Sequence, residues 1–241
     1  MRKILYISGI ILAIAIVLAV SVWALRQPRN EVCRELHIRI TPPQESFVSE
    51  SEIRTLLRQN DLDPIGQPME QVQLQAIEDR VTSHAMVRRA QCYRHGDASV
   101  RLLVEQRHPL LRVVTATESY FVDSDRQRMP IRAGIQSDAI HVTGHVGERM
   151  AKEELADLVE WLQDNSFWQP RIRRIEVREG KQIVLHQKTN EPRILIGTVE
   201  NFEKKMHKVR IYIEETIAQS YDFPNYRELD ARFDGQVVGR K

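Results

Sequence analysis

An uninterrupted apolar run close to the N-terminus constrains this chain more than any other feature. Residues 4–25 carry no charged side chain and consist mainly of Ile, Leu, Val and Ala. At about 1.5 Å per residue, a helix over this run would be roughly 33 Å long, which is enough to cross the hydrocarbon core of a bilayer. The run therefore predicts one transmembrane helix over residues 4–25, preceded by a short stub at residues 1–3.

A cleavable signal peptide is the alternative interpretation of this run. Arg2 and Lys3 supply a basic start, and Val22-Trp23-Ala24 offers a poor small-residue cleavage site. The apolar run is, however, longer than the roughly 7–15 residues that are usual in a signal peptide. We therefore expect an anchor that stays in the protein.

The orientation of the anchor follows from the size of what comes after it. Arginines just beyond the run do not by themselves favour an external C-terminus, but long domains cross the membrane largely regardless of charge. The stub at residues 1–3 leaves little room for a cytoplasmic function. We expect residues 1–3 to be cytoplasmic and the part beyond residue 25 to be extracytoplasmic. The arginines concerned are Arg26, Arg29, Arg34 and Arg39.

The charge balance excludes one class of partner. The chain has 35 Lys and Arg residues against 33 Asp and Glu residues, a formal net charge of +2. A balance this even creates no strong overall field toward nucleic acid. No nucleic-acid partner is expected.

After a linker at residues 26–32, residues 33–106 predict a small β-α-α-β-β module. Leu36, Ile38 and Ile40 alternate with polar residues, which is typical of a half-buried strand. Ser49 and Glu52 fit a capping box, which starts a helix. The other expected elements are a helix from about residue 68 through residue 81 and two strands at about 87–95 and 98–105.

Residues 107–241 predict a mixed or antiparallel β domain with two helices, so the fold class is α+β. Leu155, Leu158, Val159 and Leu162 fall on one face of a helix expected at about 149–164. A longer apolar seam predicts a helix at about 198–219, and a final strand is expected at about 226–238. The remaining strands are expected at about 110–115, 119–123, 139–143, 193–196 and in a hairpin around 178–181.

Several short motifs, in order, resemble the bacterial division proteins of the FtsQ/DivIB family. The β-α-α-β-β module resembles the POTRA module, and Pro109 follows its last strand as in that family's domain junction. An acidic turn follows an aromatic strand, with Asp125 or Arg126 where many relatives have Gly, and Gly197 leads into the last helix. The motifs are VEQRHPLLRV at 104–113, YFVDSD at 120–125, MPI at 129–131, IGT at 196–198 and LDARFDGQVV at 229–238, the last especially similar to Bacteroidetes versions.

The resemblance implies a non-enzymatic scaffold of the divisome in the bacterial inner membrane at the septum, with its C-terminal domain periplasmic. The implied partners are FtsB-like and FtsL-like bitopic proteins, with other division proteins contacting the POTRA-like module. No cofactor and no metal are implied. In the family the final strand is where the FtsB-like partner adds its own strand, and this role transfers by position to Arg232, Phe233, Asp234, Gly235, Gln236 and Val237.

This partner-binding role is physically reasonable, because an edge strand presents unpaired N–H and C=O groups. Phe233 would be an aromatic anchor, and Gly235 would allow close approach of a partner backbone. The alternative is that Phe233 is a core residue and Gly235 a bulge. An Arg that contributes to the partner site on an internal strand of some relatives has no clear match in this sequence.

Two cysteines and two histidines leave other chemistries open. Cys33 and Cys92 could form a disulfide in an oxidising compartment, or they could be two buried free thiols. His141 and His145 are four residues apart, but the surrounding Val and Gly residues favour a strand and a turn over a metal-binding helix. A membrane-anchored hydrolase that uses this pair is therefore disfavoured. A POTRA-bearing subunit of a transport or secretion system is the other alternative.

Overall fold

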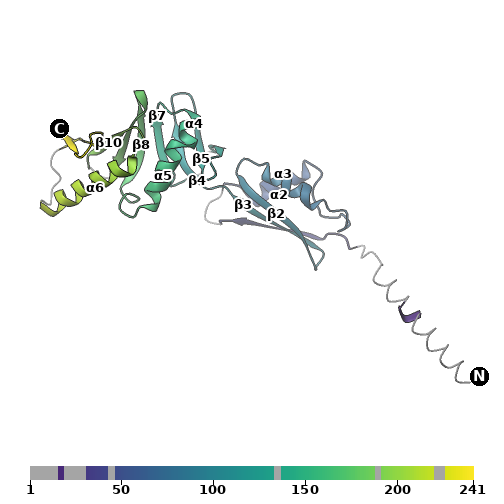
Figure 1. The fold of residues 1–241 in the computed structure, drawn as a ribbon. Helices are drawn as coiled ribbons and strands as arrows, with labels where there is room; N and C mark the ends of the chain where they lie inside the picture. Colours follow the sequence, from purple (N-terminus) through teal and green to yellow (C-terminus); the bar gives the residue numbers. More distant parts are fainter. Residues whose placement is uncertain (1–15, 19–30, 43–46, 133–136, 188–190, 220–225) are drawn as a thin grey trace, which may run out of the picture.

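The computed structural model describes residues 16–18, 31–42, 47–132, 137–187, 191–219 and 226–241. The described residues form an α+β structure with a three-stranded sheet and a nine-stranded sheet (Figure 1). Of the predicted anchor at residues 4–25, only residues 16–18 are described, and these are helical. A search of the described part of the chain for helices long and apolar enough to span a bilayer finds none.

The first unit has the element order that the sequence predicts. Strand β1 is parallel to β3 at one edge of the three-stranded sheet, and β2 is antiparallel to β3 at the other. The two helices cover one face, and their Ile53, Leu57, Ile77 and Val81 are almost completely buried. The elements are β1 Glu35–Thr41, α2 Glu50–Arg58, α3 Leu74–Thr82, β2 Val87–His95 and β3 Ser99–Gln106.

The start of each helix in this unit has a local cause. Ser49 Oγ accepts a hydrogen bond from Glu52 N at 3.2 Å, as the predicted cap requires. The second helix begins at Leu74, and the expectation that it starts near residue 68 is wrong. Pro68 forms a bridge with Val32, and Met69 N donates to Glu31 O at 2.9 Å. These contacts hold the segment against the chain that enters the unit, so the helix starts later.

The second unit is built on the nine-stranded mixed sheet, in the order β12-β11-β10-β9-β8-β7-β4-β5-β6. Helices α4, α5 and α6 contribute to a large apolar cluster on one face of the sheet (Figure 1). The elements are β4 Pro109–Val114, β5 Ser119–Asp123, β6 Arg128–Pro130, β7 Ile140–Gly144, α4 Glu148–Lys152, α5 Glu154–Asp164, β8 Ile172–Arg178, the 3-10 turn η1 Glu179–Lys181, β9 Gln182–Gln187, β10 Arg193–Gly197, α6 Phe202–Gln219, β11 Glu228–Asp230 and β12 Val238–Arg240.

Two predicted elements are divided in the structure. The helix expected at about 149–164 is broken at Glu153, whose φ of −103° and ψ of −84° are not helical, so α4 and α5 are separate. The single final strand expected at about 226–238 is wrong. It is replaced by β11 and β12, which are antiparallel and joined through a turn in which Gly235 has a φ of +73°. Glycine adopts this left-handed conformation without steric strain.

The two units meet through apolar and ionic contacts. Phe121, Met129 and Ala139 of the second unit belong to the apolar cluster of the first unit. Ion pairs across the same boundary join Arg88 to Asp125 at 2.6 Å and Arg132 to Glu52 at 2.7 Å. The boundary at β5 and β6 is therefore a packed interface, and the opposite end of the nine-stranded sheet, at β12, lies farthest from it in strand order.

Candidate functional site

Strand β12 forms the C-terminal edge of the nine-stranded sheet. It pairs with β11 alone among the described strands, with Glu228 opposite Arg240 and Asp230 opposite Val238. One further main-chain bond, from Arg227 N to Arg240 O at 2.8 Å, continues the ladder. An edge strand with pairing on only one side has main-chain groups available to a further strand.

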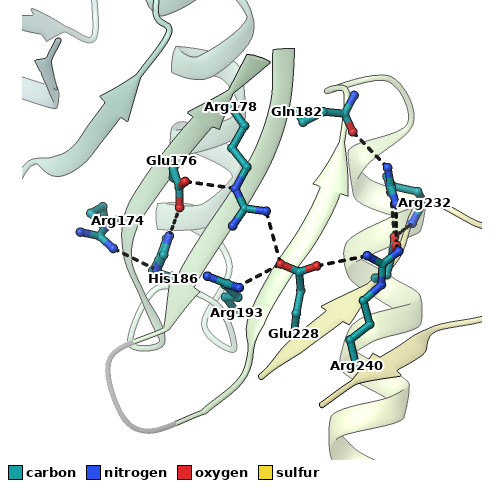
Figure 2. A network of polar contacts seen from close by, with 10 residues as sticks. Arg174, Glu176, Arg178, Gln182, His186, Arg193, Glu228, Arg232 and Arg240 are labelled. Carbon is teal, nitrogen blue, oxygen red and sulfur yellow. Dashed lines mark hydrogen bonds and ion pairs between the residues drawn. The ribbon is translucent and has the colours of Figure 1, made fainter. Parts of the chain in front are cut away.

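Two buried carboxylates lie directly beside this edge, on β11. Glu228 has 8% of its side chain exposed and Asp230 has 0%. Leu229, between them, points into the apolar cluster under the helices, so the two acidic side chains point to the opposite face. Figure 2 shows Glu228 at the centre of a polar network on that face.

Arginines from four segments neutralise the two carboxylates. Glu228 contacts Arg193 of β10 at 3.0 Å and Arg178 of β8 at 3.5 Å. Asp230 contacts Arg232 at 2.8 Å, and Arg240 of β12 contacts Asp230 at 2.5 Å and Glu228 at 3.9 Å. Arg240 thus links the edge strand to both acids of its neighbour, and Figure 2 shows its contact with Glu228.

The environment of Asp230 keeps it ionised. Burial raises the pKa of this carboxyl group, but the hydrogen bonds from Arg232 and the charges of Arg232 and Arg240 outweigh that effect. The resulting pKa lies below the usual value for Asp. The edge strand is therefore held by a permanent charge at neutral pH.

The network continues away from the edge along β8 and β9. Glu176 contacts Arg178 at 3.1 Å and His186 at 2.8 Å, and His186 Nδ1 accepts a hydrogen bond from Arg174 at 3.1 Å. Burial raises the pKa of Glu176, yet the bonds from His186 and Arg178 lower it overall. Polar side chains on five successive strands are thereby linked on one face of the sheet (Figure 2).

The structure places the six predicted partner-binding residues in the connection between β11 and β12, not in a strand. Arg232 is bound to Asp230, and its side-chain stem packs over Gly197, where an added Cβ would lie 3.0 Å from it. Phe233 has 44% of its surface exposed and is not a core residue. Gly235 lies in the turn and not in a bulge of the ladder. Asp234 and Gln236 are exposed, and Val237 is half-buried.

Sequence reasoning missed the residues that fix the edge in place: Glu228, Asp230, Arg240 and Gly239. A Cβ at Gly239 would approach the Tyr226 ring to 2.8 Å, so this glycine allows Tyr226 to pack across β12. The alternation of Glu228, Leu229 and Asp230 signals a strand with one buried side. It does not show that the polar side is also covered, because the covering arginines come from distant segments.

The cysteines and histidines considered in the sequence lie away from this edge. Cys33 and Cys92 are both free, buried thiols, which is the second of the two alternatives. Burial, with smaller effects from Glu78 and Cys33, raises the pKa of Cys92 to about 12. His141 lies on β7 and His145 just after it. Among the described residues, no three His, Cys, Asp or Glu side chains converge as they would around a metal ion.

We expect Asp230→Asn to lower the free energy of unfolding by about 1–3 kcal/mol at pH 7, because the buried partner of Arg232 and Arg240 loses its charge. The folded-state pKa of Asp230 is depressed, so its contribution is present above the unfolded value of about 3.9 and is lost as the pH falls through the folded value. Chemical denaturation at pH 7 and pH 3 should show a smaller difference between the two proteins at pH 3. A difference that does not change with pH would contradict this.

Comparison with known proteins places both units. A family model described as FtsQ/DivIB, C-terminal related, matches residues 108–240, and a model of the POTRA-like domain matches residues 31–105. A search of curated proteins finds no match to the chain. Because the match at residues 108–240 spans more than half of the 241 residues, the chain belongs to the FtsQ/DivIB family.

Proposed function

We propose that this protein is a membrane-anchored, non-enzymatic scaffold of the division machinery that captures a bitopic partner at its C-terminal sheet edge. Membership of the FtsQ/DivIB family, whose members are non-enzymatic division proteins, supports the scaffold role. The POTRA-like domain is a second surface for other division proteins. The partners proposed for the edge are FtsB-like and FtsL-like proteins, at the septum in the inner membrane and with the binding domain in the periplasm.

The observation that carries the proposal is the geometry of β12. A partner strand added beside it would gain main-chain hydrogen bonds that each contribute a net of about 0.5–1.5 kcal/mol. The edge is already positioned before binding, because Arg240 is bound to Asp230 and Glu228. A preorganised edge loses less conformational entropy when a partner binds.

The turn before β12 supplies a second contact. Phe233 is exposed, and its carbonyl accepts a hydrogen bond from Lys208 Nζ, which holds the turn against α6. An exposed aromatic side chain on a fixed turn is the type of residue that dominates binding energy at interfaces. We therefore assign the anchor role to Phe233 and a positioning role to Arg232.

We expect deletion of residues 238–241 to abolish capture of an FtsB-like partner in a pull-down from membranes. The deletion removes the edge strand together with Arg240, so Arg240→Gln is the matched control that keeps the strand and loses the charge. The control should weaken capture without abolishing it, because the strand remains but loses its bonds to Asp230 and Glu228, and thermal unfolding should show that both variants stay folded. Undiminished capture by the deletion variant would remove the edge-strand hypothesis.

Phe233→Ala should weaken partner binding by about tenfold or more, because it truncates an exposed anchor. It should leave the melting temperature nearly unchanged, since surface substitutions usually change stability by no more than about 0.5 kcal/mol. Ile211→Ala, at another exposed apolar residue, serves as the control and should affect neither quantity. A large fall in melting temperature with unchanged binding would show that Phe233 has a structural role instead.

The topology is tested independently of any partner. A reporter enzyme that folds only in the periplasm, fused after Lys241, should be active in cells. A reporter that is active only in the cytoplasm, fused at the same point, should be inactive. The reverse pattern would show that the C-terminal domain lies on the cytoplasmic side.

A further inference from the structure

A row of basic side chains crosses the face of the nine-stranded sheet opposite helices α4, α5 and α6, several strands away from β12. Cross-strand register places Arg112 of β4 beside His141 of β7, His141 beside Arg174 of β8, and Arg174 beside His186 of β9. Residues directly opposite each other on neighbouring strands point to the same face. The row begins at Phe121 of β5, over which the Arg112 guanidinium lies 5.9 Å from the ring centre.

The two arginines of this row have no acidic partner. Neither Arg112 nor Arg174 forms an ion pair with an Asp or Glu of the described residues, and Arg112 Nε is buried with no hydrogen-bond partner there. The nearest acidic residue of the network, Glu176, is bound to Arg178 and His186. This contrasts with β11, where each carboxylate has two or more arginines.

The pKa of His141, which lies between the two arginines, reflects their uncompensated positive charge. Partial burial, and then the charges of Arg112 and Arg174, lower its pKa below the usual value. The groups that face it from the neighbouring strands are therefore cationic on both sides. An anion bound between them would relieve this repulsion.

A cleft of about 560 Å³ adjoins the row. His141, Arg173 and Arg174 contribute its basic side, and Asp138 contributes one carboxylate. Leu162, Trp168 and Ile172 also line it, but they belong to the apolar cluster under the helices and are almost completely buried. The part of the cleft that a ligand can contact is therefore mainly polar and basic.

The chemistry favours a polypeptide over a small oxyanion. The main-chain N–H groups of these strands are used in the sheet ladder, whereas phosphate sites typically present free backbone N–H groups. Arg112 and Arg174 lie two strand spacings apart, roughly 10 Å between their backbones, so the row presents its positive charge along a stretch of surface and not at one point. Two carboxylates on one extended segment match this spacing.

We propose that the surface formed by Arg112, His141, Arg174 and the adjoining cleft binds a polypeptide segment that carries two acidic side chains. This surface is centred on β4, β7 and β8 and does not require the edge at β12 to be the partner site, although Arg174 is linked to Glu228 through His186, Glu176 and Arg178. It gives the scaffold a further docking surface on the same domain.

The test uses the full chain in detergent micelles and a neutral fluorophore on the peptide acetyl-Gly-Glu-Leu-Gly-Glu-Gly-amide, with fluorescence anisotropy as the measurement. Its twin with Gln in place of both Glu residues should bind at least about fivefold more weakly, because two charge-assisted contacts are lost. Arg112→Gln with Arg174→Gln should weaken binding of the Glu peptide by a similar factor. Arg174→Gln alone, at an exposed position, should weaken binding of the Glu peptide by a smaller factor. It tests the proposal even if the double variant misfolds.

The matched control is Arg89→Gln with Arg149→Gln, two exposed arginines on other surfaces, and it should leave binding within about twofold. Deletion of residues 238–241 should also leave it unchanged, which separates this surface from the proposed edge site. Equal binding of the two peptides, or unchanged binding by the Arg112 and Arg174 variant, would overturn the proposal. Displacement of the peptide by inorganic phosphate but not by chloride at equal ionic strength would overturn it in favour of a small-anion site.

Discussion

The helices of the second unit cover only one face of its nine-stranded sheet, and this constraint determines the rest of its surface. Side chains alternate between faces along each strand, so a strand that buries Ile175 and Val177 under the helices must direct Arg174, Glu176 and Arg178 to the other side. The first unit covers that side only at its β5–β6 end, where Phe121 and Met129 pack into the first unit's apolar cluster. The polar groups on that side must therefore be satisfied by one another, by solvent or by a partner.

The polar side chains on this face are satisfied differently around β11 and around β7. Around β11 the acidic side chains are buried and each is matched by arginines, so the network is closed and fixes the position of β12. Buried ion pairs contribute little net stability compared with apolar packing. They favour one specific arrangement, because losing one partner leaves the other charge buried and unpaired and lowers the stability of the fold. Around β7 the arginines have no such match. The first region is suited to positioning an edge, and the second to attracting an acidic group.

Local patterns predicted those elements whose causes are local. Ser49 caps its helix, and the apolar spacing of Leu155, Leu158 and Leu162 identifies the helix that packs on the sheet. The division of the last strand was not predictable, because the turn depends on Arg232 reaching back to a buried Asp230. The burial of Glu228 depends on Arg178 and Arg193, which are distant in sequence.

The basic row could not be predicted from the sequence either, because its residues are also distant from one another in the chain. Arg112, His141 and Arg174 lie on three strands separated by about 30 residues each, and only the register of two parallel pairs brings them together. A sequence pattern of period two shows that each points away from the apolar side of its own strand. It does not show which strands are neighbours, and it therefore cannot show that three basic side chains share one small surface.

The short, charged edge strand can accept a partner strand while it limits aggregation. Long, flat edge strands promote aggregation, and proteins limit this with short edges and charged side chains. Strand β12 has only three residues and carries Arg240, so it offers few main-chain groups to an unspecific neighbour. At the other edge of the sheet, Met129 of β6 packs into the apolar cluster of the first unit. So short a strand gives limited affinity through its backbone alone. Selective capture must therefore rely on side chains near the strand, and the exposed Phe233 on its fixed turn is the side chain best placed to supply it.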